Sequence, residues 1–210
     1  MHPQLVVMET CSITGWVHDL WVEQGYEGLV ADPSQEAWRW QNVKRKPDQD
    51  AALKLAKLAA LDQIKPVYVP AAPSRQYRQL VKYRNTVVNR VNRIQHNMRA
   101  LVDQQGVKIP AGDGAWTVAG IEELSQHRKP MSQCDMSNLW RGELALELTM
   151  LDQLGEHLAC IERQLEELAK SQEQVQLLQT IPGVGRTTAE VIVACLDAPK
   201  RFENVQQVSA

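Results

Sequence analysis

Two long segments without proline constrain the fold of this 210-residue chain more than any other feature. They run from Arg75 to about Gln104 and from about Ser137 to Leu178, and in both the apolar residues recur mostly every three, four or seven positions. This spacing puts apolar side chains on one face of a helix, so each segment is predicted to form one long amphipathic helix. The apolar positions are Leu80, Val87, Val91, Ile94, Met98 and Leu101 in the first helix, and Leu144, Leu148, Leu151, Leu154, Leu158, Ile161, Leu165 and Leu168 in the second.

Two such helices can bury their apolar faces in two ways. They can pair as an antiparallel coiled-coil arm, or they can belong to a compact helical bundle. A loop containing proline and glycine over residues 106–113 is compatible with both arrangements. Periodicity alone leaves the choice open.

The amino-terminal part has a different pattern. Short apolar runs at residues 4–8, 28–31 and 67–69 are predicted to be strands. Helical spacing from Trp16 to about Gly25 and a strongly amphipathic run over 49–61 predict helices between them. Alternating strands and helices indicate a parallel sheet with helices on its faces.

We therefore predict an α/β fold followed by an all-α part. The predicted divisions are an α/β domain over 1–73, a long helical arm over 74–178 and the start of a further helical domain over 179–210. Within the first division, a short helix containing Trp38 and Trp40 and an exposed basic loop over 44–47 are also expected.

Charge is distributed unevenly along the chain. The net charge is −2, which favours no particular partner, but no acidic residue occurs between Gln63 and Val102. A segment of one sign is typical of nucleic-acid binding, and its cations predict phosphate contacts. The alternative is an ordinary solvated helix face. The cations are Lys65, Arg75, Arg78, Lys82, Arg84, Arg90, Arg93 and Arg99.

A glycine-rich turn precedes the last predicted helix. The run Thr180–Ala189 contains Gly183, Val184 and Gly185, followed by Arg186 and Thr187. Glycines allow a sharp turn and a close approach to a ligand, and the free N–H groups of the next helix can bind a phosphate. The pattern resembles a helix-hairpin-helix element that binds the DNA backbone. An ordinary helical corner is the alternative.

Three acidic residues are candidates for a metal site. Glu9 ends the first predicted strand, where open α/β sheets bind ligands, and Asp48 and Asp50 begin the helix of 49–61. Converging carboxylates can hold Mg²⁺, which supports phosphodiester cleavage. The alternative is that the aspartates cap the helix and the glutamate is solvated.

Several motifs in one order resemble a known family. They are Val6-Val7-Met8-Glu9-Thr10, Gly15-Trp16-Val17-His18-Asp19-Leu20, Lys46-Pro47-Asp48, Ala52-Leu53-Lys54-Leu55-Ala56-Lys57-Leu58, Val67-Tyr68-Val69-Pro70, Thr180-Ile181-Pro182-Gly183-Val184-Gly185 and Arg201-Phe202. Together they resemble bacterial insertion-sequence transposases that join a RuvC-like DEDD nuclease domain to a carboxy-terminal serine domain, a group that includes the pilin-gene invertases.

The resemblance implies an RNase H-like first domain, a Mg²⁺-dependent acidic tetrad and a nucleophilic serine. It also implies homo-oligomers assembled on DNA, guided in some members by a structured RNA. Glu9 would be the second acid of the tetrad and Asp48 the third.

The sequence departs from this pattern at functional positions. Ala51 occupies the place of the fourth acid, and Asp50, one residue earlier, points elsewhere on a helix. The first aspartate would lie before residue 1, and the serine segment would follow Ala210. We therefore expect a truncated, catalytically impaired transposase that still binds DNA.

A non-enzymatic DNA- or RNA-binding module, or a relic acting through hetero-oligomers, is the alternative function. No signal peptide or membrane-length apolar run is present, so we expect a cytoplasmic, nucleoid-associated protein without a membrane partner.

Overall fold

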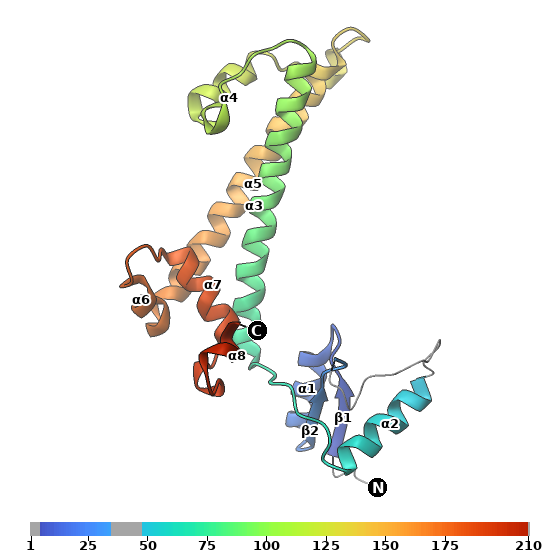
Figure 1. Ribbon diagram of the computed structural model, residues 1–210. Helices are drawn as coiled ribbons and strands as arrows, with labels where there is room; N and C mark the ends of the chain where they lie inside the picture. The colour runs from blue at the N-terminus through green and yellow to red at the C-terminus, as the bar shows by residue number, and fades with distance from the viewer. Residues whose placement is uncertain (1–4, 35–47, 210) are drawn as a thin grey trace. The chain divides into compact units, whose positions relative to one another are not determined.

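The computed structural model describes residues 5–34 and 48–209. In that part of the chain it contains eight α-helices and one two-stranded sheet, so the predicted α/β part followed by helices is confirmed at this level. The chain divides into two compact units, residues 1–77 and 78–210 (Figure 1). The predicted helix at Trp38 and Trp40 and the basic loop over 44–47 lie outside the described residues.

The first unit contains a parallel pair of strands. Strand β1 (Leu5–Glu9) pairs with β2 (Glu27–Ala31) in the register that sets Val7 opposite Leu29. Helix α1 (Thr14–Glu23) connects them. It ends before Gly25, whose φ of +75° suits glycine and turns the chain back toward the sheet.

Helix α2 (Asp48–Ala60) supplies apolar side chains to this unit. Leu55 is buried with Ala31 of β2 and with Ile64, which follows the helix. Ala51 and Leu58 are partly buried against the same cluster. The face of α2 that includes position 51 is therefore an apolar packing face.

The predicted third strand at 67–69 is wrong. The chain makes one isolated antiparallel bridge between Ala31 and Pro66, and the Val67 N–H donates to Val30 O at 2.8 Å. Pro66 and Pro70 flank the run, and proline has no N–H to donate to a ladder. The run is extended without forming a strand.

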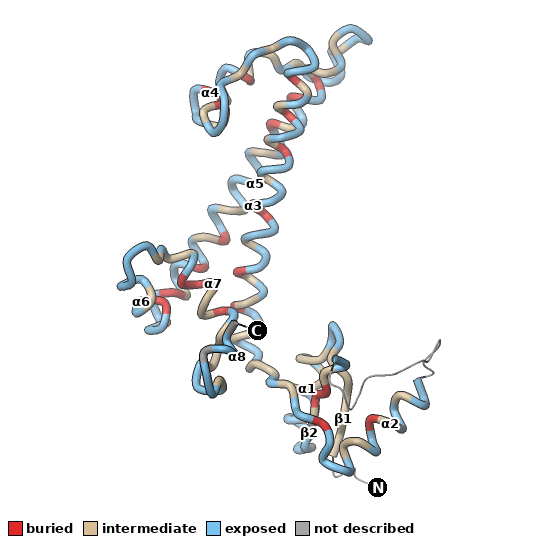
Figure 2. Tube along the Cα trace, viewed as in Figure 1, coloured by how far each residue is buried: buried red, intermediate tan, exposed pale blue. Residues whose placement is uncertain are grey.

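Two long helices, α3 (Ala72–Gln104) and α5 (Leu139–Lys170), dominate the second unit and run side by side (Figure 1). Arg84 of α3 pairs with Glu162 of α5, whereas Met98 shares a buried cluster with Leu148. Later residues of α3 therefore meet earlier residues of α5, and the helices are antiparallel. Figure 2 marks the buried positions in red along both.

The predicted extent of the second long helix is wrong at its end. Helix α5 stops at Lys170, and a separate helix α6 spans Glu173–Gln179. The Ser171 hydroxyl donates to Leu168 O at 2.9 Å, and Gln172 has an extended backbone with φ −107° and ψ 98°. Serine competes for backbone hydrogen bonds in this way, whereas no proline or glycine marks the break in the sequence.

A short helix, α4 (Val118–Ser125), lies between the long helices in sequence. Thr117 caps it by accepting a hydrogen bond from the Gly120 N–H at 3.2 Å. Leu124 of α4 joins the buried cluster of α3 and α5. Two 3₁₀ turns, Gly112–Trp116 and Met131–Gln133, flank α4.

The carboxy-terminal elements are α7 (Arg186–Leu196), a 3₁₀ turn at Pro199–Arg201 and α8 (Val205–Ser209). Val175 of α6 and Ala189 of α7 are fully buried in one cluster with Ala169 of α5. This cluster fixes the α6–α7 corner to the end of α5. Among the described residues, no helix is long and apolar enough to cross a membrane.

Candidate nucleic-acid interface

The structure divides the predicted cations of α3 into two groups. Arg75, Arg78, Arg84 and Arg99 are half-buried and bind other parts of the chain, whereas Lys82, Arg90 and Arg93 are exposed. Within the described parts of the chain, the side chains of these three make no hydrogen bond or ion pair.

The first group stabilises the fold. Arg75 pairs with Asp19 and donates to Pro70 O at 2.5 Å. The hydrogen bond from Arg75 lowers the pKa of Asp19 below its usual range. Arg78 donates to the Ala194 carbonyl at the end of α7 at 2.6 Å. These guanidinium groups satisfy acceptors that would otherwise be unpaired.

Arg99 and Arg84 serve the same purpose in the second unit. Arg99 donates to Pro110 O at 3.1 Å and Gly112 O at 2.9 Å, and its guanidinium lies 5.5 Å from the Trp116 ring centroid. Arg84 pairs with Glu162 at 2.8 Å. A structural role therefore explains four of the eight cations between Gln63 and Val102 for which the sequence predicted phosphate contacts.

The second group occupies the solvent side of α3. Lys82, Asn89, Arg93 and His96 recur at helical spacing and are all exposed, on the side of α3 opposite its buried residues. At 1.5 Å per residue, the stretch from Lys82 to His96 is about 21 Å long. Cations and amides on such a surface can contact several phosphates along a strand.

The turn between α6 and α7 has free backbone donors. Gly183 has a φ of +85°, and Gly185 is the N-cap of α7. The first helical hydrogen bond runs from the Ala189 N–H to Gly185 O at 3.0 Å. The N–H groups of Arg186, Thr187 and Thr188 therefore have no acceptor within α7, and Gly183 and Gly185 leave the turn open to solvent.

The Arg186 side chain is already paired. It lies 2.9 Å from Glu166 and 3.4 Å from Glu162, both on α5, and 3.4 Å from Glu190 on its own helix. Sequence reasoning placed Arg186 against DNA and did not identify these partners. A phosphate at this corner would compete with three carboxylates for the guanidinium.

Glu190 is the buried member of this group, with 2% of its surface exposed. Its Oε1 accepts no hydrogen bond within the described residues, so its contact with Arg186 is a charge interaction only. Burial raises the pKa of Glu190, while Arg186 and Arg84 act in the opposite direction. Glu162 links the group further, because it binds Arg84 of α3 as well as Arg186 of α7.

The predicted acidic residues do not form a metal site in the described structure. Glu9 is half-buried at the end of β1, and Asp48 and Asp50 are exposed in the first turn of α2. No three His, Cys, Asp or Glu side chains of residues 5–34 and 48–209 gather closely enough to hold an ion. The described residues thus show no gathered ligand set, and the assignment of Glu9 and Asp48 as Mg²⁺ ligands stays a prediction.

A protein-family model matches part of the chain. No curated protein matches the chain significantly. The model of the Transposase IS116/IS110/IS902 family matches residues 175–210, which include the α6–α7 corner, α7 and α8. This match supports an insertion-sequence transposase and a role in transposition.

Proposed function

We propose that this chain binds the sugar–phosphate backbone of DNA as part of an insertion-sequence transposase. The observation that carries the proposal is the division of the α3 cations. Lys82, Arg90 and Arg93 are exposed without partners in the described structure, although four neighbouring arginines bind internal acceptors. Cations that the fold does not use, within a segment that has no acidic residue from Gln63 to Val102, favour a polyanionic ligand.

The α6–α7 corner is the second contact in this proposal. Its free amides suit a phosphate oxygen, and it lies within the segment that matches the transposase family. Backbone contacts of this kind hold the protein on the duplex without reading its sequence. We propose a helix-hairpin-helix role for the corner, with Gly183, Val184, Gly185 and Thr187 nearest the phosphate.

The family match also guides the wider proposal. We infer that residues 1–73 derive from an RNase H-like domain, that 74–178 form a coiled-coil arm and that 179–210 begin the transposase domain. Homo-oligomers on DNA, a structured guide RNA and association with the nucleoid belong to the same proposal. A general divalent-metal requirement follows from the family, although the described residues do not provide the site.

The test is a salt titration of duplex binding by the full chain. Each phosphate contact contributes about 0.9 to the slope of log K against log salt. The double variant Lys82→Gln, Arg93→Gln should therefore bind more weakly and lower the slope by about 2. Fluorescence anisotropy with a labelled duplex measures both quantities.

Lys170→Gln is the matched control. Lys170 is an exposed cation of α5 that pairs with Glu167 at 2.7 Å, so its loss should leave the slope unchanged. Equal effects of the double variant and the control would refute a specific role for the α3 surface. Absence of binding by the wild type at low salt would refute the function itself.

A further inference from the structure

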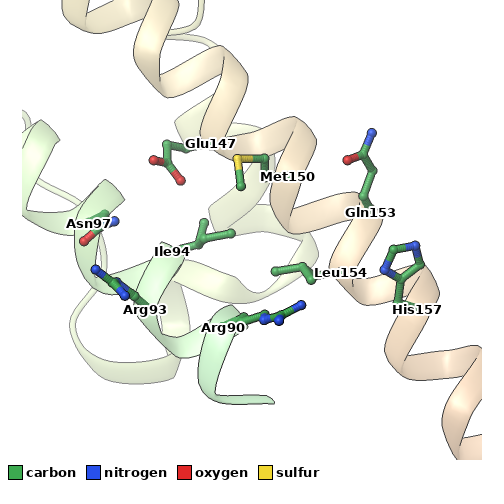
Figure 3. Close-up of a pocket in the computed structure, with 9 residues that line it drawn as sticks. All are labelled: Arg90, Arg93, Ile94, Asn97, Glu147, Met150, Gln153, Leu154 and His157. Atoms are coloured by element: carbon green, nitrogen blue, oxygen red, sulfur yellow. The ribbon is translucent and has the colours of Figure 1, made fainter. Parts of the chain in front are cut away.

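A hollow opens between α3 and α5 in the middle of their length. Its volume is about 420 Å³, within the range of small-ligand sites. Figure 3 shows its lining, with residues of both helices pointing toward the space. The lining residues are Arg90, Arg93, Ile94 and Asn97 of α3, and Glu147, Met150, Gln153, Leu154 and His157 of α5.

The floor of the hollow belongs to the packed interface of the two helices, because Ile94 is buried and Leu154 packs against the same buried cluster. Met98 and Leu148 are buried on one side, and Val87 and Ile161 are buried on the other. Between them Met150 keeps 50% of its surface exposed. Exposed apolar surface such as that of Met150 is unfavourable in water, so an occupant that covers it gains free energy.

The rim of the hollow carries unmet hydrogen-bonding groups. Oε2 of Glu147 is buried and accepts no hydrogen bond from the described residues. Buried acceptors nearly always receive a hydrogen bond, so a ligand that donates one to this oxygen would be stabilised. Burial, and then repulsion by Glu143, raises the pKa of Glu147. Arg90 and Arg93 stand on the opposite helix and are exposed.

These groups match the parts of one nucleotide. Cations on α3 suit a phosphate, the acceptor on α5 suits an N–H of a base edge, and Asn97 and Gln153 can donate and accept at the same edge. Unstacked bases bind against guanidinium planes and histidine rings, which Arg90 and His157 supply, and thioethers contact aromatic rings favourably. We propose that the hollow binds one unpaired nucleotide of a nucleic-acid strand that lies along α3.

The charge arrangement distinguishes this occupant from an apolar helix of a second protein. A helix that covered Met150 and Leu154 would bury Arg90 without an anionic partner and would leave the buried Glu147 oxygen without a donor, which costs free energy. A nucleotide is anionic at one end and carries donors at the other, so it complements both helices.

The inference rests on the proposed binding of nucleic acid to α3, and its test separates the two. The full chain is titrated into a fully paired duplex and into the same duplex with one unpaired 2-aminopurine nucleotide, each made as DNA and as RNA. The wild type should bind the bulged form about tenfold more tightly, as expected for one stacked base, with a change in 2-aminopurine emission. The backbone in which the preference is greater identifies the sugar of the ligand.

Two substitutions at exposed positions of α5 provide the variant and its control. Met150→Trp fills the hollow and should abolish the preference for the bulge while leaving affinity for the paired duplex unchanged. Leu146→Trp, at a residue 56% exposed outside the hollow, should keep the preference. Glu147→Gln should reduce the preference severalfold, because it replaces one carboxylate oxygen, an acceptor, with an NH₂ group, a donor.

Equal wild-type affinities for bulged and paired duplexes would overturn the nucleotide site while leaving backbone binding intact. A preference that survives Met150→Trp would place the unpaired nucleotide elsewhere and also overturn it. A change of self-association in Met150→Trp without a change in bulge preference would make the hollow a protein interface. Failure to bind even the paired duplex would remove the proposed function and this inference together.

Discussion

At the scale of single residues, the use of a cation depends on the acceptor that the fold brings to it. Arg78 donates to carbonyls near the end of α7. Arg186 pairs with two carboxylates of α5 and with Glu190, four residues further along its own helix. Lys82 and Arg93 have no such acceptor among the described residues. We therefore expect nucleic-acid contacts from cations without an internal acceptor, such as Lys82 and Arg93, rather than from cations that already have one.

Gly183 gives a prediction at this scale. Its φ of +85° is unfavourable for residues with a Cβ, whereas an added Cβ would meet no atom within 4 Å. Gly183→Ala should therefore destabilise the protein by about 1–2 kcal/mol through backbone strain alone. It should also weaken duplex binding, because the turn that presents the α7 amides is altered. Thermal unfolding and anisotropy measure the two effects.

Gly155→Ala is the matched control. Gly155 is exposed in the interior of α5, and an added Cβ there also meets nothing within 4 Å. Alanine should stabilise that helix by about 0.5–1 kcal/mol without changing binding. Destabilisation by both substitutions, or by neither, would contradict the conformational argument for Gly183.

At the scale of elements, α7 is held by charge as well as by apolar contacts. Ala189 packs against α6, while Arg186 and Glu190 face Glu162 and Glu166 of α5 and Arg84 of α3. Because Glu190 is the buried carboxyl of this group, we expect the stability of the α5–α7 contact to depend on pH.

The pH dependence has a definite sign. The pKa of Glu190 is raised in the folded protein above the usual glutamate value of 4.5. As pH rises from that value, the Glu190 carboxyl therefore loses its proton in the unfolded chain before it does in the folded protein. The stability contributed by protonated Glu190 is fully present below that value and is lost as pH rises through the folded pKa. The glutamine of Glu190→Gln cannot ionise. Between the unfolded and the folded pKa of Glu190, the unfolding temperature of this variant should therefore fall less than that of the wild type.

Thermal unfolding of both proteins between about pH 4 and pH 8 tests this, since the difference between them isolates Glu190 from other titrating groups. The unfolding temperature of Glu190→Gln should rise relative to that of the wild type as the pH increases. A constant difference would show that Arg186 and Arg84 balance the effect of burial on the pKa of Glu190, and a relative gain by the wild type would show that they outweigh it.

At the scale of the whole molecule, we expect binding and cleavage to depend on different parts of the chain. The net charge of −2 conceals a helix whose solvent side is cationic, and this helix needs no metal to hold a phosphate backbone. In the first unit, Ala51 packs beside Leu55 at the position where the resemblance expects an acid. We therefore expect binding to persist without efficient cleavage.

Incubation of the full chain with supercoiled DNA in Mg²⁺ tests this expectation, with Glu9→Gln as the comparison. The wild type should bind without nicking the DNA, and Glu9→Gln should bind equally. Cleavage lost in Glu9→Gln would show that the acidic site functions despite Ala51. Cleavage that survives in Glu9→Gln would remove the assignment of Glu9 as a ligand.

Much of the fold follows from local pattern. The apolar spacing of α3 and α5, the alternation of β1, α1 and β2, and the start of α7 after Gly185 were all predictable, because each depends on neighbours within a few turns of the chain. The third strand was wrong because proline removed the donors a ladder needs. The break at Ser171 was missed because a side-chain hydrogen bond, rather than a breaker residue, ends the helix.

The sequence by itself determined the acid-free segment between Gln63 and Val102, the glycine corner and the motifs at the carboxy-terminal end that match a transposase family. Only the tertiary structure decided which cations remain available, where Arg186 finds its carboxylates and that a hollow separates the long helices beside Met150. The physical reason is that a charge or an apolar side chain acquires its role from what packs against it. For Arg84 and Arg186 that partner, Glu162, lies many turns away along the chain.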